Sequence, residues 1–514
     1  MNATVSALSF TSGDQTFRTD RFSYLLCGTA ADAPFRCEGS RWELSEDRAA
    51  VELPELSLRV TRTMRACDGG AEESIEFYNY GEKKLRFSTI KLGWLLPLQE
   101  LTLHAIPFTV QQDGWRHMYS AETLRCGEHF QIVNNRLPEQ PGRYFGNSVY
   151  SDPSRPEPPL CEEGLLRSEA WFWGTERGGL LAAKYNNRDI EYAVAEPVGP
   201  AREELQLGGV GFCLYHEPSA AQELDAGQRF RFGSTFYYQA DDLTRACGLY
   251  RALLDRKGHA LPSDYAPKVH WNELYDIGWY HSDRAALNRS YTLPALLREA
   301  QKAHECGCGA LYLDPGWEFA EGTTFFDYHR LGDETELVKT LREQYGLSLA
   351  IRIILRTYVN YWPDALNAVH TPDGFASACM LPRTIIPSNQ LLYEQCLCNE
   401  PFRKEKERRA DKLAQDGAYF IMLDEMDWRG PCYHPGHGHA RPSTAYEHAD
   451  AVCRLAKHIK NTNHIQVEVH DPVWPWNSAI YTPSYWRQGF SQEGSYQENW
   501  GFEFMWDCIE DLRS

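Results

Sequence analysis

Polar and charged residues follow five short apolar segments in the second half of the sequence. They are Asp276, Asp314, Arg356, Asp424 and Asp471. If the segments are parallel strands of a barrel, their carboxyl ends meet at the face where catalytic groups gather. Two carboxylates across a cleft can hydrolyse a glycosidic bond: one attacks or stabilises the sugar, and the other protonates the leaving oxygen. The spacing therefore indicates a candidate glycoside-cleaving face.

Asp424 is the strongest candidate nucleophile. The apolar run Tyr419–Leu423 directly precedes it, so a buried strand would present its carboxylate at a tip of fixed geometry. A single aspartate at a strand end can equally cap a helix or hydrogen-bond a loop. The recurrence of polar residues at four comparable strand ends favours the catalytic interpretation.

A loop rich in possible metal ligands follows Asp424. It contains Cys432, His434, His437 and His439, and thiol and imidazole groups with a nearby carboxylate are plausible zinc ligands. Glycines and prolines interrupt this loop, which is typical of a turn-rich segment whose histidines hydrogen-bond backbone or substrate. We therefore expect no metal, and keep a metal-dependent hydrolase using the three histidines as an alternative.

The elements that must position these residues alternate between strand and helix from His270 onward. The strands are expected to end at the five polar residues, with the first running as far as Asp276. Helical periodicity, capping residues or charged runs mark the intervening helices at 292–307, 333–346, 402–417 and 445–460. Because the strands are apolar on both faces, they are expected to be parallel and buried. A TIM-type (β/α)8 barrel is favoured over an open sheet, since no glycine-rich phosphate loop follows the first strand.

The barrel is expected to be incomplete as given. A sixth strand, "SAIYTPSYW", and the start of a helix precede the end of the chain at Ser514, whereas this barrel needs eight strands. About six of the eight strands are thus expected in the second domain, 263–514. The sequence is interpreted as a fragment or a shortened gene product.

The first half has the pattern of an antiparallel β-sandwich over residues 1–262. Leu58, Val60 and Met64 alternate with polar neighbours, as in a half-buried strand. Two further runs flank "NYGEKK" and predict a hairpin over 74–92. The domain boundary is expected within Leu261–Val269.

Composition narrows the class of protein. The chain has 514 residues and a formal net charge of −19, which disfavours nucleic acid and anionic membranes as partners. An apolar run long enough to span a membrane is lacking, and so is a secretory leader. Fifteen scattered cysteines fit reduced thiols, and C-x-C pairs such as Cys396/Cys398 are expected to be buried thiols. A cytoplasmic location is predicted.

Three motifs resemble a known family. "WNELYDIGWY", "GALYLDPGWE" and "YFIMLDEMDW" follow the sandwich in that order, and together they resemble clan D glycoside hydrolases, above all the family 36 α-galactosidases. The resemblance implies a retaining enzyme without metal or organic cofactor. It implies that Asp314, in the family's LDDGW motif, binds substrate and that Trp317 forms a wall of the pocket. Asp424, in its KWD motif, would be the nucleophile.

The sequence departs from these motifs at polar positions. Pro315 replaces the second aspartate of LDDGW, and Met422 and Leu423 replace the lysine and tryptophan of KWD. The family's glycine-rich cysteine motif is replaced by "EVHDPVWPW". Each change removes a contact to galactose, so the sugar specificity stays open.

The proton donor is expected after the sixth strand, where the resemblance places it. Glu493, Glu498 and Glu503 lie there, and Glu498, directly before the expected helix, matches best. Asp471 is the alternative. A donor needs apolar surroundings or a neighbouring carboxylate to raise its pKa, which the nearby aromatic residues can supply.

The sequence thus predicts a retaining glycosidase acting on an α-linked oligosaccharide or glycoside. Asp424 is the expected nucleophile, and Glu498 or Asp471 the acid and base. The predicted substrate-binding residues are Asp276, Asp314, Trp317, Arg356, Trp428 and His470. A carbohydrate-binding protein without catalysis is the second alternative, and formation of a homo-oligomer is left open.

Overall fold

The described residues of the computed structural model form two compact units, which divide between Lys257 and Gly258. The structure describes residues 4–6, 9–12, 15–18, 21–45, 47–97, 101–106, 109–112, 115–118, 122–124, 170–175, 178–185, 192–199, 204–213, 222–259, 264, 266–277, 284–355, 357–358, 361, 363–376, 378–379, 392–424, 426, 431–443 and 445–469. The division falls a few residues before the predicted boundary at Leu261–Val269. Each unit is described by itself.

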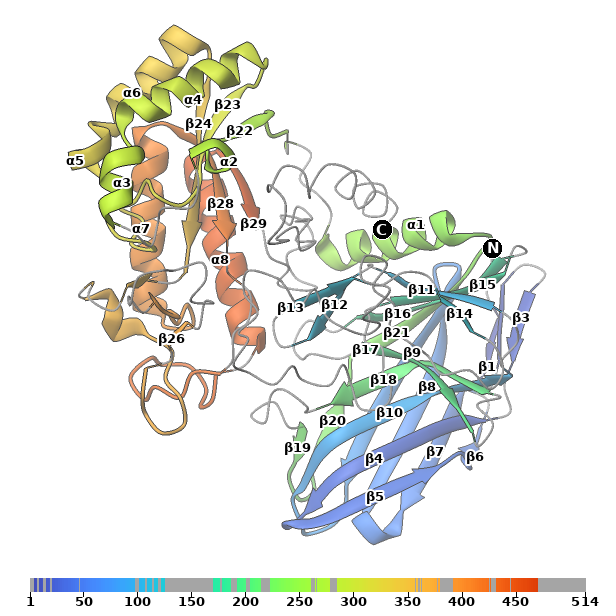
Figure 1. Ribbon diagram of the computed structural model, residues 1–514. Helices are drawn as coiled ribbons and strands as arrows, with labels where there is room; N and C mark the ends of the chain where they lie inside the picture. The colour runs from blue at the N-terminus through green and yellow to red at the C-terminus, as the bar shows by residue number, and fades with distance from the viewer. Residues whose placement is uncertain are drawn as a thin grey trace. The chain divides into compact units, whose positions relative to one another are not determined.

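The first unit contains two large antiparallel sheets (Figure 1). One sheet comprises β4 (Phe22–Ala30), β5 (Ala33–Gly39), β10 (Leu85–Pro97), β17 (Tyr192–Val198), β18 (Glu204–Cys213) and β19 (Gln222–Leu224). The other comprises β6 (Glu43–Leu44), β7 (Arg48–Leu53), β8 (Leu58–Cys67), β9 (Gly70–Asn79), β11 (Leu101–Ile106), β14 (Glu122–Leu124), β15 (Ala170–Thr175), β16 (Gly178–Tyr185), β20 (Arg229–Arg231) and β21 (Ser234–Ala240). Smaller elements are β1 (Thr4–Ser6), β2 (Ser9–Ser12), β3 (Gln15–Arg18), β12 (Thr109–Gln112), β13 (Trp115–Met118) and helix α1 (Leu243–Leu254). One hydrophobic core takes buried side chains from both large sheets, so they form the sandwich that the sequence predicted.

Strand β8 confirms the predicted alternation, with one addition. Leu58, Val60 and Met64 are buried, but Arg62 lies on the same inner face with 0% exposure. Its guanidinium pairs with the buried Glu73 carboxylate of β9, which also accepts a hydrogen bond from Tyr237. A charge on an inner face is tolerated only when it is paired and hydrogen-bonded, and this pair meets that condition.

The predicted hairpin over 74–92 is wrong. Strand β9 pairs with β8, β20 and β21, whereas β10 pairs with β4, β18 and β19. The chain therefore crosses from one sheet to the other between these strands. Buried Asn79 holds the crossing, because its side-chain amide donates to the carbonyls of Lys83, Leu224 and Asp225 and its oxygen accepts from Gly81 N.

The second unit is built on a parallel sheet whose described strands follow chain order (Figure 1). They are β22 (His270–Asn272), β23 (Ala310–Leu313), β24 (Ser348–Ile354), β28 (Ala418–Asp424) and β29 (Gln466–Val469). Helices α4 (Leu293–Glu305), α6 (Glu334–Thr340), α7 (Glu400–Asp416) and α8 (Ala445–Asn463) connect them, with the short helices α2 (Leu274–Ile277), α3 (Arg284–Ser290) and α5 (Tyr328–Leu331). A small antiparallel sheet, β25 (Thr357–Tyr358), β26 (Ala378–Cys379) and β27 (Leu392–Tyr393), lies in the segment between β24 and α7. The predicted alternation of parallel strand and helix is confirmed over this range.

Successive residues of the parallel strands face opposite sides of the sheet. Leu311 and Ile351 belong to the core shared with the helices. Tyr312, Ala350 and Phe420 form a separate cluster on the other side. Because side chains alternate along a strand, this inner face continues towards the carboxyl ends of the strands, where the predicted site should lie.

The predicted first strand to Asp276 is wrong: β22 ends at Asn272 and Asp276 lies in helix α2. The Asn272 side-chain oxygen accepts from Leu274 N at 2.9 Å, which turns the chain out of the sheet. The predicted missing strands concern residues after 469, which lie outside the described residues.

Among the described residues, no helix is long and apolar enough to cross a membrane.

The Arg62–Glu73 pair yields a stability prediction. We expect Glu73→Gln to lower the free energy of unfolding by about 3–5 kcal/mol, because Arg62 loses its buried counter-charge. Glu76→Gln is the matched control on the same strand: Glu76 pairs with Arg229 at 2.7 Å, and both side chains are exposed, so its effect should be within about 0.5 kcal/mol. Denaturant unfolding measures both, and equal losses would contradict the account.

Candidate active site

Arg352 on strand β24 is the centre of a buried charge cluster at the carboxyl ends of the parallel strands. Its Nε contacts an oxygen of Asp424, at the end of β28, and lies 3.4 Å from Oδ1 of Asp314, directly after β23. Its Nη1 lies 3.3 Å from Oε1 of Glu321. All four side chains are buried. The structure thus brings Asp314 and Asp424 together, as the sequence predicted. They lie around Arg352, a cation that was not predicted from the sequence.

Asp314 is held from the neighbouring strand as well. Asn272, at the end of β22, donates its amide to Asp314 Oδ2 at 2.6 Å. The backbone N–H of Asp314 donates to Glu273 Oε1 at 2.9 Å, and the Tyr291 hydroxyl donates to the same oxygen at 2.5 Å. Burial first, and then the charge of Asp314, raise the pKa of Glu273 well above its usual range. Glu273 is therefore a structural group that fixes the backbone of Asp314.

Tyr312 lies on the inner face between these carboxylates and the rest of the strand cluster. Its hydroxyl donates to the sulfur of Met422 at 3.3 Å. Burial, followed by the negative charges of Asp314 and Asp424, raises its pKa well above the ordinary value. The phenol stays protonated, so Tyr312 contributes an apolar ring and a neutral hydroxyl.

Trp317 is a core residue in the structure. It is only 1% exposed, packs in the core shared by strands and helices, and donates its indole N–H to the carbonyl of Arg352 at 2.9 Å. It was expected to form a wall of the sugar pocket. Its placement instead makes it a positioning group for Arg352, because the LDPGW turn folds back over strand β24.

The loop that carries Asp314 and Glu321 is fastened to helix α7 by two buried cations. Lys406 donates to the carbonyl of Gly322 and, at 2.9 Å, to the Thr324 hydroxyl. Arg409 donates to Thr323 O at 2.8 Å and pairs with Asp364 at 2.7 Å. Burial lowers the pKa of Lys406 to about 8.

Glu318 also holds this loop in place. Its carboxylate accepts from the backbone N–H groups of Gly322 and Thr324, at 2.8 and 2.6 Å. Thr324 has a φ of +59°, a conformation that non-glycine residues hold only when the surroundings impose it. These contacts restrict the loop, so the carboxylates of Asp314 and Glu321 that it carries have little freedom to move.

The other predicted site residues fall into two groups. Asp276 lies outside the cluster: the residue is exposed, and its side chain pairs with Lys302 of α4 at 2.6 Å. The remaining predicted residues lie outside the described part of the chain; they are Arg356, Trp428, His470, Asp471 and Glu498. Both candidate proton donors are therefore still predictions.

Sequence reasoning missed Arg352, Glu321, Asn272 and Glu273. Arg352 had a detectable signal, because it is a lone charge within the apolar strand "LSLAIRIIL", and a charge in a buried strand needs a partner. It is also directly opposite Met422 in the strand register. Met422 stands where the family's KWD motif has lysine. Arg352 on the neighbouring strand therefore supplies the positive charge beside Asp424.

A second cluster combines sulfur and imidazole groups. Cys396, Cys432, His437 and His439 each offer one ligand atom, and these atoms all lie within 4.8 Å of one another. His434, predicted as a possible ligand, is not among them, whereas Cys396 joins from a distant part of the sequence. This donor set suits zinc.

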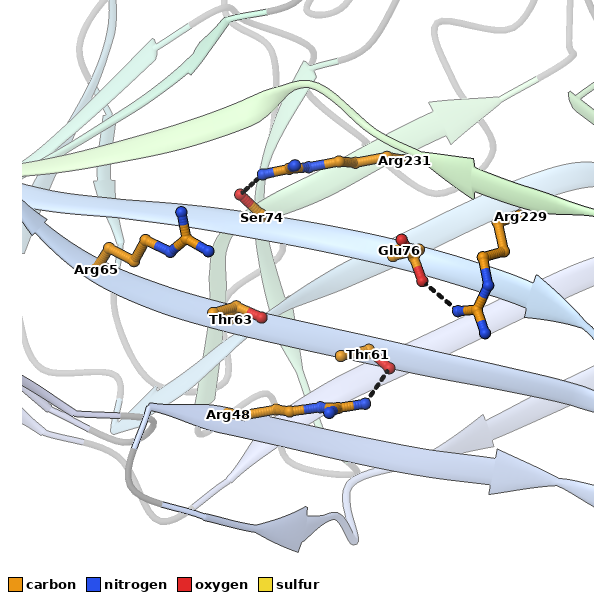
Figure 2. A pocket seen from close by; sticks show the side chains of 8 residues that line it. All are labelled: Arg48, Thr61, Thr63, Arg65, Ser74, Glu76, Arg229 and Arg231. Carbon is orange, nitrogen blue, oxygen red and sulfur yellow. Dashed lines mark hydrogen bonds and ion pairs between the residues drawn. The ribbon is translucent and has the colours of Figure 1, made fainter.

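A cationic groove lies on the outward face of the first unit (Figure 2). Arg48, Arg65, Arg229 and Arg231 line it with Glu76 and several hydroxyl groups. Arg229 pairs with Glu76, and Arg231 donates to Ser74 at 2.8 Å. With a single carboxylate among its lining residues, the groove cannot supply the two acids that glycoside hydrolysis needs.

Sequence comparison identifies no relatives: no protein-family model and no curated protein matches this chain.

Solved structures do match in fold. The family 36 α-galactosidase AgaA of Geobacillus stearothermophilus aligns over 97% of this chain and 76% of its own, with 13% identity and a TM-score of 0.53. AgaB of the same organism aligns over 98% and 77%, with 12% identity and a TM-score of 0.53. The α-N-acetylgalactosaminidase NagBb of Bifidobacterium bifidum aligns over 94% and 78%, with 13% identity and a TM-score of 0.53. The predicted resemblance to family 36 of clan D is confirmed at the level of the fold.

Arg352 yields the first site prediction. We expect Arg352→Met to lower the free energy of unfolding by about 3–5 kcal/mol, because three buried carboxylates lose a shared cation. The deficit should shrink on mild acidification, since protonation then removes the uncompensated charge. Unfolding followed by circular dichroism at neutral and mildly acidic pH measures both effects. Arg342→Met, whose side chain is 71% exposed, is the control, and a deficit independent of pH would contradict the prediction.

Lys406 yields a pH prediction. Its folded-state pKa is lowered to about 8, whereas an unfolded chain keeps a lysine proton up to about pH 10.4. Between these values the unfolded state binds more protons, so the stability of the native protein relative to Lys406→Met should rise with pH. Free energies of unfolding at about pH 7 and about pH 9.5 measure this difference. Lys404→Met, an exposed neighbour on the same helix, should show no such trend. A decrease with pH in the stability of wild type relative to Lys406→Met would refute the claim.

Proposed function

We propose that the protein is a retaining glycoside hydrolase acting on an α-linked sugar, with chemistry like that of α-galactosidases. The observation that carries the proposal is the meeting of Asp314 and Asp424 around Arg352 at the carboxyl ends of adjacent parallel strands. Catalytic residues of barrel enzymes come from the ends of several different strands at this face. The shared fold with family 36 supports the same reaction class.

In the proposed reaction, the Asp424 carboxylate attacks the anomeric carbon and forms a glycosyl ester while the glycosidic C–O bond breaks. Glu498, or alternatively Asp471, donates a proton to the departing oxygen. The same group then removes a proton from water, which attacks the ester and releases Asp424. Arg352 orients Asp424 and offsets the repulsion between it and Asp314.

Asp314 is proposed to bind sugar hydroxyls, since its backbone is fixed by Glu273 and its side chain by Asn272 and Arg352. Arg356, Trp428 and His470 are proposed to complete the substrate site. Oligosaccharides are the proposed substrate class: structures of AgaA variants with stachyose and with raffinose are among the matches. Pro315 and Met422 replace polar motif residues, so the sugar need not be galactose.

A carbohydrate-binding protein without catalysis is the second candidate. One observation favours it: an oxygen of Asp424 is engaged by Arg352 inside a buried network, and such an arrangement also suits a purely structural carboxylate. The two candidates differ in turnover, since a binder would retain glycans without releasing a product. Titration calorimetry with stachyose on the full chain would detect binding in either case.

The decisive test is hydrolysis of a panel of aryl α- and β-glycosides by the full chain and its Asp424→Asn variant. We expect turnover of an α-glycoside that falls by about 10⁴-fold or more in the variant, because the covalent route is lost. Asp373→Asn, an exposed aspartate on a turn, is the matched control and should keep full activity. Circular dichroism must show that Asp424→Asn is folded.

Azide extends this test to the mechanism. With Asp424→Gly, azide should restore turnover and give a glycosyl azide of inverted, β configuration, because it attacks the face that Asp424 had occupied. Turnover that persists in Asp424→Asn, or activity confined to β-glycosides, would overturn the proposal.

A further inference from the structure

We propose that Cys396, Cys432, His437 and His439 bind one zinc ion as a structural site. Cys396 precedes helix α7, and the other three residues lie in the loop 431–443 between β28 and α8. Their ligand atoms lie within 4.8 Å of one another, and all but His439 are buried. Cys396 and Cys432 are 36 positions apart in the sequence, yet their sulfurs lie together with the two imidazoles. Two sulfurs and two imidazoles are a common ligand set of structural zinc.

The geometry is close to that of a tetrahedral site. Zinc–sulfur and zinc–nitrogen bonds of about 2.3 and 2.0–2.1 Å place ligand atoms roughly 3.3–3.8 Å apart. Cys432 Sγ and His437 Nδ1 are already separated by 3.4 Å. All four ligand atoms lie within 4.8 Å of one another, so each pair has to close by about 1 Å at most, which small side-chain rotations can supply.

The hydrogen-bond partners of both imidazoles favour the tautomer that a metal requires. His439 Nδ1 lies 2.6 Å from the carbonyl of Ala440, and a carbonyl only accepts, so this nitrogen carries the proton. Its Nε2 is then a lone-pair acceptor, and that atom is buried without a hydrogen-bond partner. His437 Nε2 similarly faces the carbonyl of Leu366 at 3.5 Å, which leaves Nδ1 towards Cys432. Metal-bound histidines characteristically donate their second ring N–H to such a backbone carbonyl.

Two backbone donors beside the sulfur of Cys432 would stabilise a zinc-bound thiolate. The backbone N–H groups of His370 and His434 both point at Sγ, at 3.5 Å. Two donors on one sulfur offset negative charge, which a neutral thiol, a weak acceptor, does not need. The His434 ring stacks on His437 with centroids 4.0 Å apart, so it supports a ligand from outside the ligand set.

The backbone around the cluster is already cross-linked by hydrogen bonds. Cys396 N donates to Asn367 O at 2.8 Å, and Tyr433 N donates to His370 O at 2.9 Å. Cys432 N donates to the Ser443 hydroxyl at 2.8 Å. Zinc would join the segments that follow β24 and β28, which the bond between Tyr433 and His370 already connects.

Four protein ligands define the role of this metal. A catalytic zinc ion keeps an open position for water, whereas a structural ion is closed by protein ligands. The proposed ion therefore does not serve the metal-dependent hydrolase that the histidine motif suggested. It steadies the loop that follows Asp424, which lies eight residues before Cys432. The inference is independent of the glycosidase proposal.

The metal content of the full chain, purified without a metal-binding tag or chelator, tests the proposal. We expect one zinc per chain by mass spectrometry of the elements, and loss of most of it in Cys396→Ser and His439→Ala. Cys398→Ser is the matched control, since its thiol lies two residues away but outside the set, and it should keep its zinc. Zinc that Cys396→Ser and His439→Ala retain, or that Cys398→Ser loses to the same extent, would overturn the assignment.

Cobalt replacement gives a readout that does not depend on variants folding. Cobalt(II) in the wild-type protein should show thiolate charge-transfer absorption and the intense visible bands of a tetrahedral site. A chelator should lower the melting temperature of wild type. A folded wild-type protein without zinc that binds no cobalt, or one whose Cys396 and Cys432 form a disulfide, would refute the site.

Discussion

The contact of Arg352 with Asp314 and Asp424 is the interaction on which the candidate site depends. Two buried carboxylates at neighbouring strand ends repel each other strongly where little water screens them. A guanidinium between them turns that repulsion into an ordered cluster. The desolvation cost of these charges is offset only if every partner is held in place. The surrounding residues hold these partners in place.

Three neighbouring side chains hold the residues of the cluster in place. Trp317 fixes the backbone of Arg352, Glu273 fixes the backbone of Asp314, and Lys406 fastens the loop that carries Glu321. These groups lie on different helices, strands and loops, so the position of the two carboxylates is a property of the whole second unit. Such rigidity suits a nucleophile that must meet an anomeric carbon at a defined distance.

The sequence predicted the architecture better than the contacts. Parallel strands and their ends could be read from apolar runs, and Asp424 terminates β28 as expected. Arg62 and Arg352 were missed because periodicity arguments treat a charge as facing solvent, whereas each is buried against a carboxylate distant in sequence. The crossing after β9 was mistaken for a hairpin because local turn signals do not specify which sheet the next strand joins. Cys396 was likewise left out of the histidine cluster, since only the fold brings it beside Cys432.

The most direct test of the central claim is chemical trapping of the nucleophile. The full chain would be incubated with the deoxyfluoro α-glycosyl fluoride of the sugar that it hydrolyses. This reagent forms a glycosyl ester on the nucleophile quickly, and the ester hydrolyses slowly. The protein would then be digested and its peptides sequenced by mass spectrometry. The account predicts a single added sugar on Asp424. A label on another carboxylate, or an active protein that accumulates no label on Asp424, would contradict it.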